Sequence, residues 1–264
     1  MKVKTKEILE IFQSIDNVEG RMEVLKNAYA GETLYVIAAG PSLNNYSPNQ
    51  LKNVLQDKLV MCVKQPYHLL KDLSDFLLVN FTNLSPYDWK EHTITAWTFW
   101  FEQHPEVVFK NGWKGDLLFP VFRNANIEDK LSQSVAAKGD FENLMFDKTL
   151  PRPWGPGLVY ELAIPLAVHM GVKEIVTIGW DVGDINMWND SSNEDERHFV
   201  EHFYSSETQM YDRFTMEAKE IKLITDSILP IYQYLQSIGI DFKIISDRNP
   251  APVQVPRINL EDIK

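Results

Sequence analysis

The chain has 264 residues, 44% of them hydrophobic, and a formal net charge of −11, which is typical of an ordinary globular protein with one large domain. The acidic balance argues against nucleic-acid binding, because that function needs a basic face. No stretch approaches the roughly 20 apolar residues of a membrane-spanning helix. No apolar signal core follows the charged N-terminus, and the single cysteine, Cys62, excludes an intrachain disulfide framework. We therefore expect a cytoplasmic protein.

The first segment, about residues 5–29, predicts an amphipathic helix. Its apolar residues recur at spacings of three and four: Ile8, Ile11, Phe12 and Ile15. Gly20 is expected to break this helix into two parts and Gly31 to end it. Residues 1–31 would then form a helical arm ahead of the first strand, which packs against the domain or contacts a second copy in a homo-oligomer.

Three apolar runs predict the first strands of a sheet. They span residues 34–39, 58–63 and 75–80. Runs that are apolar throughout suit parallel strands buried on both faces. Helical segments near 48–56 and 67–73 separate them, so the order strand–helix–strand–helix–strand predicts the α/β class. The expected architecture is a Rossmann-like, doubly wound, mostly parallel sheet.

An irregular, aromatic insert is expected at about 81–150, with a strand-like piece at 117–122 and a helix around 127–137. After this insert, the rest of the chain continues the alternation of helices and strands. The expected elements are a helix at 158–170, a strand at 173–181, a polar lid loop at 182–206, a long helix at about 207–238 and a last strand at 241–246. Pro230 is expected to kink or split the long helix. Residues 32–248 would form one nucleotide-binding domain, followed by an extended tail at 249–264.

Ligands of doubly wound sheets bind beyond the carboxyl ends of the strands. The residues that follow the predicted strands are Gly40-Pro41-Ser42, Lys64 with Gln65, Asn80 and Asp181. Gly40 permits a tight turn, and Ser42 can cap a helix whose free N–H groups attract an anion. The turn is therefore either a phosphate cradle or a plain turn without ligand.

The other strand-end and loop residues also have two interpretations each. Lys64 is a phosphate contact or a surface lysine, and Asp181 is a functional carboxylate or a helix cap. Arg152, between Pro151 and Pro153, either contacts a phosphate through its guanidinium or braces the loop. The acidic loop lacks the spacing of a metal site, so we predict no required metal.

Three short motifs in this order resemble a known family. They are Gly-Pro-Ser-Leu at 40–43, then Gly155-Pro156-Gly157 with Gly179-Trp180-Asp181, and a histidine-bearing polar loop before a long helix. The chain resembles the bacterial sialyltransferases of the Campylobacter type, which transfer sialic acid from CMP-sialic acid. It is also similar to the wider group of motility accessory factors and archaeal hydroxymethylpterin diphosphokinase-like proteins. The resemblance covers most of residues 33–246.

The resemblance implies a nucleotide-binding fold with the Gly-Pro-Ser turn against the nucleotide and Lys64 with Gln65 near the donor. It implies that the segment that opens the helix expected at 158–170 contacts the cytidine or the sugar. The residues of this segment are Arg152, Trp154, Gly155, Pro156 and Gly157. It also implies a catalytic base at His202, with His198 as the rival.

The chain departs from the family at Ala39 and Lys64, where the sialyltransferases carry asparagine. The family's two tyrosines after the Gly-x-Asp strand have no clear match, and Tyr204 or Trp188 would have to replace them.

The function that follows is an inverting glycosyltransferase-like enzyme of cell-surface glycan biosynthesis, in which His202 removes a proton from the acceptor hydroxyl. The donor would be a nucleotide-activated sugar, with a CMP-linked acidic sugar such as sialic acid favoured, and no cofactor would be required. The acceptor would be a glycan or another hydroxyl compound; a lipid-linked acceptor would bring the protein to a membrane surface. One alternative is a pterin-type diphosphokinase that uses a nucleoside triphosphate and Mg²⁺, with Asp181 and Asp184 as ligands. Another is an inactive nucleotide-binding protein.

Overall fold

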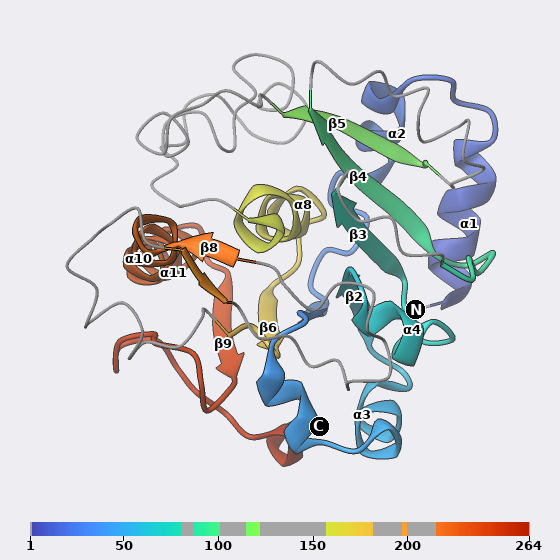
Figure 1. The fold of residues 1–264 in the computed structure, drawn as a ribbon. Helices are drawn as coiled ribbons and strands as arrows, with labels where there is room; N and C mark the ends of the chain where they lie inside the picture. The colour runs from blue at the N-terminus through green and yellow to red at the C-terminus, as the bar shows by residue number, and fades with distance from the viewer. Residues whose placement is uncertain are drawn as a thin grey trace.

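The computed structural model describes residues 2–80, 87–100, 115–121, 157–181, 197–199 and 215–263. Within these ranges, seven parallel strands form a central sheet in the order β5-β4-β3-β2-β1-β6-β9, and helices cover both faces (Figure 1). The expected fold class, an α/β Rossmann-like sheet, is confirmed. Two short strands, β7 and β8, form a separate antiparallel pair.

The strands of the main sheet are β1 (Thr33–Ile37), β2 (Leu59–Val63), β3 (Phe76–Asn80), β4 (Ile94–Trp100), β5 (Leu117–Val121), β6 (Glu174–Ile178) and β9 (Asp241–Ile245). The antiparallel pair is β7 (Arg197–Phe199) and β8 (Thr215–Glu217). The helices are α1 (Lys2–Phe12), α2 (Val18–Leu25), α3 (Pro48–Leu55), α4 (Pro66–Leu70), α8 (Ile164–His169), α10 (Ala218–Asp226) and α11 (Ile228–Ser237). Three tighter or wider turns complete the described elements: the 3₁₀ helices η1 (Pro41–Asn45) and η4 (Leu260–Asp262), and the π-helical turn η2 (Val159–Ala163).

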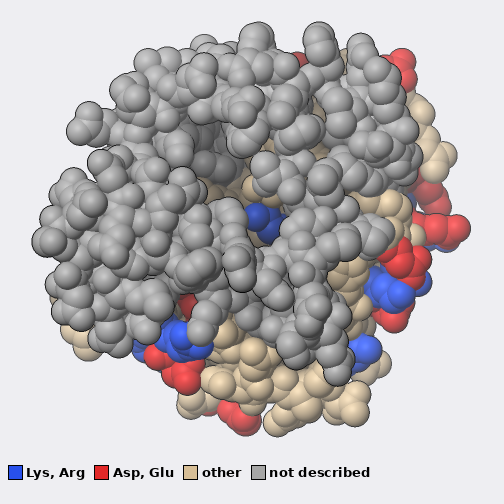
Figure 2. Space-filling view, viewed as in Figure 1, with Lys and Arg blue, Asp and Glu red and all other residues tan. Residues whose placement is uncertain are grey.

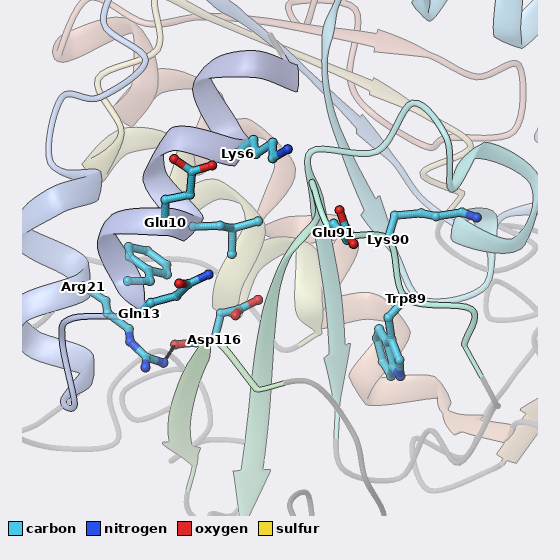
Figure 3. Close-up of a pocket in the computed structure, with 10 residues that line it drawn as sticks. Lys6, Glu10, Gln13, Arg21, Trp89, Lys90, Glu91 and Asp116 are labelled. Carbon is cyan, nitrogen blue, oxygen red and sulfur yellow. Dashed lines mark hydrogen bonds between the residues drawn. The ribbon is translucent and has the colours of Figure 1, made fainter.

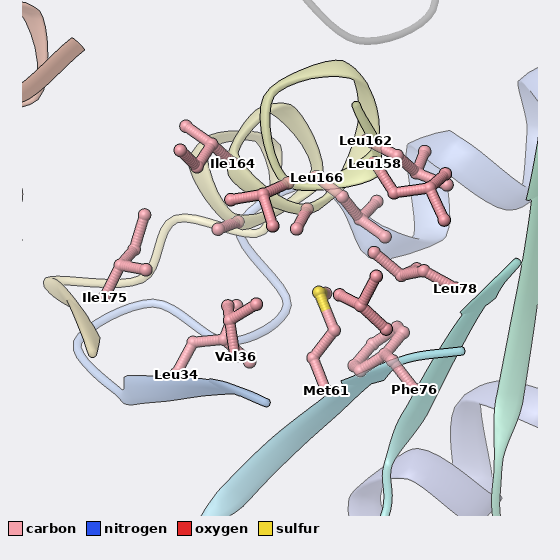
Figure 4. Packing of buried hydrophobic residues seen from close by; sticks show 14 of the residues in the cluster. Leu34, Val36, Met61, Phe76, Leu78, Leu158, Leu162, Ile164, Leu166 and Ile175 are labelled. Atoms are coloured by element: carbon pink, nitrogen blue, oxygen red, sulfur yellow. The ribbon is translucent and has the colours of Figure 1, made fainter. Parts of the chain in front are cut away.

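The sheet separates two apolar cores because successive strand residues point to opposite faces. In β1, Leu34 and Val36 join the core under α1, α2, α8, α10 and α11, whereas Tyr35 and Ile37 join the core under η1, α3 and α4. Figure 4 shows the first core, where Leu158, Leu162, Ile164 and Leu166 meet the strand residues Met61, Phe76 and Leu78. Burial on both faces explains why these strands are apolar throughout.

The N-terminal helix breaks earlier than expected. Its first part, α1, ends at Phe12, and Asn17 caps the second part, α2, by accepting a hydrogen bond from Gly20 N at 2.7 Å. Gly20 therefore lies inside α2, and the prediction that it breaks the helix is wrong. An asparagine side chain that can satisfy a free N–H is a stronger start signal than a glycine is a stop signal.

Two prolines shape the helices that follow. Pro165 has no N–H, and its ring crowds the carbonyl one turn earlier, so the preceding residues form the wider η2 turn before α8 starts. Pro230 acts similarly. The long helix divides at Ser227, three residues before Pro230, which places the proline in the first turn of α11, where no N–H is needed. The expected split is confirmed.

The C-terminal tail folds back on the sheet rather than running extended. Ile244 and Arg257 form a parallel bridge, and Leu260 in η4 is buried in the core beside α3. Asn45 Nδ2 donates to Asp247 Oδ2 at 3.1 Å, which ties the start of the tail to η1. The tail therefore reaches the end of β1, as Figure 1 also shows.

Two expectations fall wholly or largely on undescribed residues. The helix expected around 127–137 lies outside the described residues, and so does most of the lid loop expected at 182–206, of which only β7 is described. None of the helices in the described ranges is both long enough and apolar enough to cross a bilayer.

Candidate functional site

β1 is the strand at which the order of strands along the sheet reverses. β1 pairs with β2 on one side and with β6 on the other, both in parallel, and the chain winds away from β1 in both directions. Open α/β sheets bind ligands at such a switch point, beyond the carboxyl ends of the strands. The residues that follow β1, β2, β3, β6 and β9 meet at this edge, so we call it the carboxyl-edge site.

Two glycines bring the ends of β1 and β6 into contact. Gly40 N donates to Gly179 O at 2.7 Å, and a Cβ on Gly40 would lie 2.5 Å from that same oxygen. Gly179 has φ +70, and a Cβ there would lie 2.6 Å from Ala38 O. The glycines of the Gly-Pro-Ser and Gly-Trp-Asp motifs are thus required by the same close approach of two backbones.

Asp181 binds the turn that follows β1. Its Oδ2 accepts a hydrogen bond from Ser42 N at 2.6 Å, and its Oδ1 accepts one from Ser42 Oγ at 2.7 Å. A third hydrogen bond comes to Oδ1 from Ser246 Oγ, directly after β9. One carboxylate therefore joins the ends of β1, β6 and β9.

This arrangement changes the role expected of the Gly40-Pro41-Ser42 turn. The Ser42 N–H, which we expected to meet a phosphate, already donates to a carboxylate from the same chain. A phosphate at that position would have to displace Asp181 and would meet its negative charge. In this structure the turn and Asp181 brace the carboxyl-edge site from within.

Ser246 is a residue of this site that sequence reasoning missed. Its Oγ accepts hydrogen bonds from Arg248 N and Asn249 N, both at 3.0 Å, so its own proton is directed to Asp181. Asn249 in turn donates to Trp180 O at 2.6 Å. The available signal was position: Ser246 follows its strand just as Gly40, Lys64 and Asp181 follow or close theirs.

Lys64 follows β2 in a strained conformation. Its φ is +63, in the left-handed region that residues with a Cβ seldom adopt, and its N–H donates to Leu78 O at 2.8 Å. Strain of this kind persists only where the surroundings impose it and is frequent in ligand sites. The side chain is partly buried, as is that of Gln65, which starts α4 without a capping hydrogen bond from its side chain.

Asn80 ends β3, the next strand along the edge. It stands in register with Thr98 of β4, and its side-chain oxygen Oδ1 is buried with no hydrogen-bond partner in the described part of the chain. A buried amide oxygen without a partner costs roughly 1–3 kcal/mol, so such atoms are uncommon unless something else satisfies them. A ligand hydroxyl or amino group is one way to satisfy it.

Beside the site, Trp180 of the Gly-Trp-Asp motif packs edge-on against Tyr160, with ring centroids 5.2 Å apart. The Tyr160 hydroxyl donates to Ile224 O at 2.8 Å, and burial raises the pKa of this phenol well above its usual value. Tyr160 therefore remains a neutral hydrogen-bond donor that fixes η2 to α10. Gly157, one of the expected ligand contacts, precedes η2 with φ +105, and no atom of the described residues lies within 4 Å of its Cβ position.

Six of the expected site residues lie outside the described residues, and so does Asp184: Arg152, Trp154, Gly155, Pro156, His202 and Tyr204. His198 lies in β7, where its backbone is in register with Met216. The described ranges contain no group of three or more His, Cys, Asp or Glu side chains arranged to hold a metal ion.

The face shown in Figure 2 is hollowed near its middle, and Lys or Arg atoms lie at the floor of the hollow. Acidic side chains on this face lie mostly toward its periphery. Positive charge within a concave surface suits an anionic ligand, although the chain as a whole is acidic.

Comparisons with known proteins give one informative likeness. No protein-family model matches the chain, and no curated protein matches it. Among solved structures, the fold is similar to that of the MAf glycosyltransferase from Magnetospirillum magneticum AMB-1, with a TM-score of 0.50 and 13% sequence identity. The likeness covers 89% of this chain and 34% of that chain, so this chain spans about a third of its length. At this identity the likeness shows a shared fold.

Proposed function

We propose that the protein is a glycosyltransferase-like enzyme that binds a nucleotide-activated sugar at the carboxyl-edge site and transfers the sugar to a hydroxyl acceptor. The observation that carries the proposal is that Asn80 and Lys64 lie at the ends of neighbouring strands. Asn80 has a buried side-chain oxygen without a partner among the described residues, and Lys64 has a left-handed backbone conformation. The fold shared with a MAf glycosyltransferase supports the reaction class. A CMP-linked acidic sugar such as sialic acid is the favoured donor.

We assign the donor phosphate to Lys64 rather than to the Gly40-Pro41-Ser42 turn. The Ser42 N–H is engaged by Asp181, and Lys64 carries a positive charge at the next strand end. Charge stabilisation of a departing phosphate is commonly the largest catalytic contribution in such transfers. Arg152, which lies outside the described residues, would add a second cation.

Asn80 would orient the donor. Its buried Oδ1 can accept a hydrogen bond from a hydroxyl of the ribose or sugar, or from an amino group of the base. His202 remains our candidate for the base that deprotonates the acceptor hydroxyl in a single inverting displacement, with Tyr204 beside it in the sequence. The acceptor would be a glycan or a lipid-linked compound, and neither a cofactor nor a metal is proposed.

A diphosphokinase is the weaker hypothesis. It would need Asp181 as a Mg²⁺ ligand, but this carboxylate already accepts three hydrogen bonds from Ser42 and Ser246. Binding Mg²⁺ there would break the contacts that hold three strand ends together.

A thermal-shift experiment tests the proposal. The melting temperature is measured with CMP, CDP, ATP and GTP, each with and without Mg²⁺. We expect CMP to raise it without metal, by about 5 °C at 100 times the dissociation constant. Lys64→Ala and Asn80→Ala should reduce this shift, whereas the exposed α3 controls Lys52→Ala and Asn53→Ala should retain it.

The outcomes separate the hypotheses. Stabilisation only by a triphosphate with Mg²⁺ would favour the diphosphokinase, and no response to any nucleotide would refute both enzymes. If CMP binds, transfer of the sugar from a CMP-linked donor to hydroxyl acceptors is measured next. Binding without transfer would favour an inactive nucleotide-binding protein, and transfer that His202→Ala leaves unchanged would show that the base is wrongly assigned.

A further inference from the structure

A pocket lies at the opposite edge of the sheet from the carboxyl-edge site. It has a volume of about 630 Å³ and lies between α1 and the segment 89–91, with Asp116 near the start of β5 (Figure 3). Since β4 and β5 run parallel to the other strands, this is the amino edge, about 20 Å from the carboxyl edge along a strand. A volume of this size fits a small ligand of several rings.

Several charged groups of the pocket are already used within the protein. Arg21 donates to Ile15 O at 2.9 Å and to Asp116 O at 2.7 Å. The Asp116 carboxylate accepts from Thr95 N at 2.7 Å. Lys90 forms ion pairs with two other carboxylates and points away from α1 in Figure 3. These groups shape the pocket and leave little charge for a ligand.

Four exposed polar side chains of the pocket have no hydrogen-bond or ion-pair partner among the described residues. They are Lys6, Glu10 and Gln13 on α1, and Glu91 on the facing segment. Together they offer carboxylate acceptors, an ammonium donor and an amide that does both. Their net charge is slightly negative, which disfavours an anionic ligand and suits a neutral one with many hydroxyl groups.

Trp89 supplies the apolar wall. Its ring packs at a tilt against Trp97, with centroids 6.1 Å apart, and against Tyr87 at 5.2 Å, so it is held in place from the protein side. It remains partly exposed and lines the pocket at the sheet edge, on the opposite face of the sheet from α1. An indole face is electron-rich and apolar, and therefore attracts the weakly positive C–H groups on one face of a pyranose ring.

We propose that this pocket, formed by Lys6, Glu10, Gln13, Trp89 and Glu91, binds a neutral oligosaccharide. One pyranose ring lies on the indole of Trp89 near Glu91, and hydroxyl groups of the next ring donate to the carboxylate of Glu10. This site is separate from the carboxyl-edge site. It would give the protein a second sugar-binding surface, able to hold a distant part of a long glycan.

The experiment titrates the full chain with three neutral sugars, maltotriose, lactose and N,N′-diacetylchitobiose, and with the acidic polymer colominic acid. Binding is measured by calorimetry and by saturation-transfer NMR of the sugar protons. We expect at least one neutral sugar to bind with a dissociation constant near about 1 mM. Trp89→Ala should weaken it about tenfold and Glu91→Gln several-fold. Tyr232→Ala and the exposed Glu261→Gln, both distant in sequence and in other elements, are the matched controls.

The proposal is overturned if none of the neutral sugars binds, if colominic acid alone binds, or if the Trp89 and Glu91 variants bind like the controls. Because Glu91 is exposed, Glu91→Gln decides the matter even if Trp89→Ala does not fold. No nucleotide is present in this experiment, so a failure here leaves the proposed transferase activity open, and the reverse is also true.

Discussion

At Gly40, packing alone requires a glycine, because any side chain would clash with neighbouring atoms. Its φ is −73, an ordinary value for any residue, yet a Cβ would lie 2.5 Å from both Asp181 Oδ2 and Gly179 O. Gly40→Ala should therefore force β1 and β6 apart and lower the free energy of unfolding by about 2–3 kcal/mol, measured by urea denaturation.

The matched control for Gly40→Ala is Gly239→Ala. Gly239 has φ +78, but no atom of the described part of the chain lies within 4 Å of its Cβ position, so the control carries backbone strain of about 1 kcal/mol. Equal losses in the two variants would show that the contact between the two strand ends is not a constraint.

Among elements, α1 is anchored by a buried hydrogen-bond chain rather than by apolar contacts alone. Thr5 Oγ donates to Asp75 Oδ1 at 2.7 Å, so the Tyr29 hydroxyl must be the donor in its own 2.9 Å contact with Thr5 Oγ. All three side chains are fully buried, and burial raises the pKa of Tyr29 above its usual value. The Asp75 carboxylate also accepts from Val60 N, which connects α1 to the start of β2.

Thr5→Val tests this anchor, because valine keeps the shape and removes the hydroxyl. We expect a loss of about 1–3 kcal/mol in unfolding free energy and faster amide hydrogen exchange confined to α1. Thr225→Val is the control, since within the described ranges the Thr225 hydroxyl bonds only to Ile221 O of its own helix, at 2.9 Å. Uniformly faster exchange across the sheet would contradict a local anchor.

The contact between α8 and α2 should make stability depend on pH. Burial is the main cause that lowers the pKa of His169, and it outweighs the bond from Nε2 to Met22 O at 2.6 Å. The unfolded chain, with an ordinary histidine pKa of about 6.5, then binds more protons than the folded chain below that pH. Stability should fall as the pH drops through about 6.5, and less steeply in His169→Gln. Chemical denaturation at pH 7 and pH 5 measures this difference, and parallel curves would contradict it.

The elements that sequence patterns predicted best are those with one dominant physical signal. β1, β2 and β3 are continuous apolar runs, and both of their faces are buried. β4 was not placed from the sequence because Thr95 and Thr98 interrupt its apolar pattern, although both are buried. The break after α1 was misplaced because Asn17, not Gly20, starts the second helix.

For the candidate site, the sequence predicted only the edge of the sheet at which it lies. The rule that parallel strands end together places Gly40, Lys64, Asn80 and Asp181 on one side of the sheet. It does not say which of these side chains touch, because Ser42 and Asp181 are 139 residues apart and their contact depends on the packing of β1 against β6. The hydrogen bond from Ser42 N to Asp181, which weighs against the phosphate-cradle hypothesis, could be learned only from the three-dimensional structure.

For the molecule as a whole, the C-terminal tail stabilises the carboxyl-edge site beside the end of β1. Arg257 donates from Nη1 to Ser246 O at 2.9 Å, and from Nη2 to Asn249 O at 2.5 Å and Ala251 O at 3.0 Å. Ser246 binds Asp181, and Asp181 binds Ser42. A chain of contacts therefore runs from the last segment of the protein to the turn after its first strand.

Arg257→Lys should break this chain of contacts while keeping the charge, because an ammonium cannot donate in the planar fork that reaches three carbonyl groups. We expect a loss of about 1–3 kcal/mol in unfolding free energy, and faster amide exchange both in residues 249–263 and at Ser42. Val253→Ala, at a position 93% exposed in the same tail, controls for a general effect of altering that segment. Faster exchange in the tail with unchanged exchange at Ser42 would show that the tail packs on the sheet without supporting the site. Faster exchange at both places would mean that the carboxyl-edge site is stabilised by segments from both ends of the chain, and that ligand binding there should in turn protect the tail.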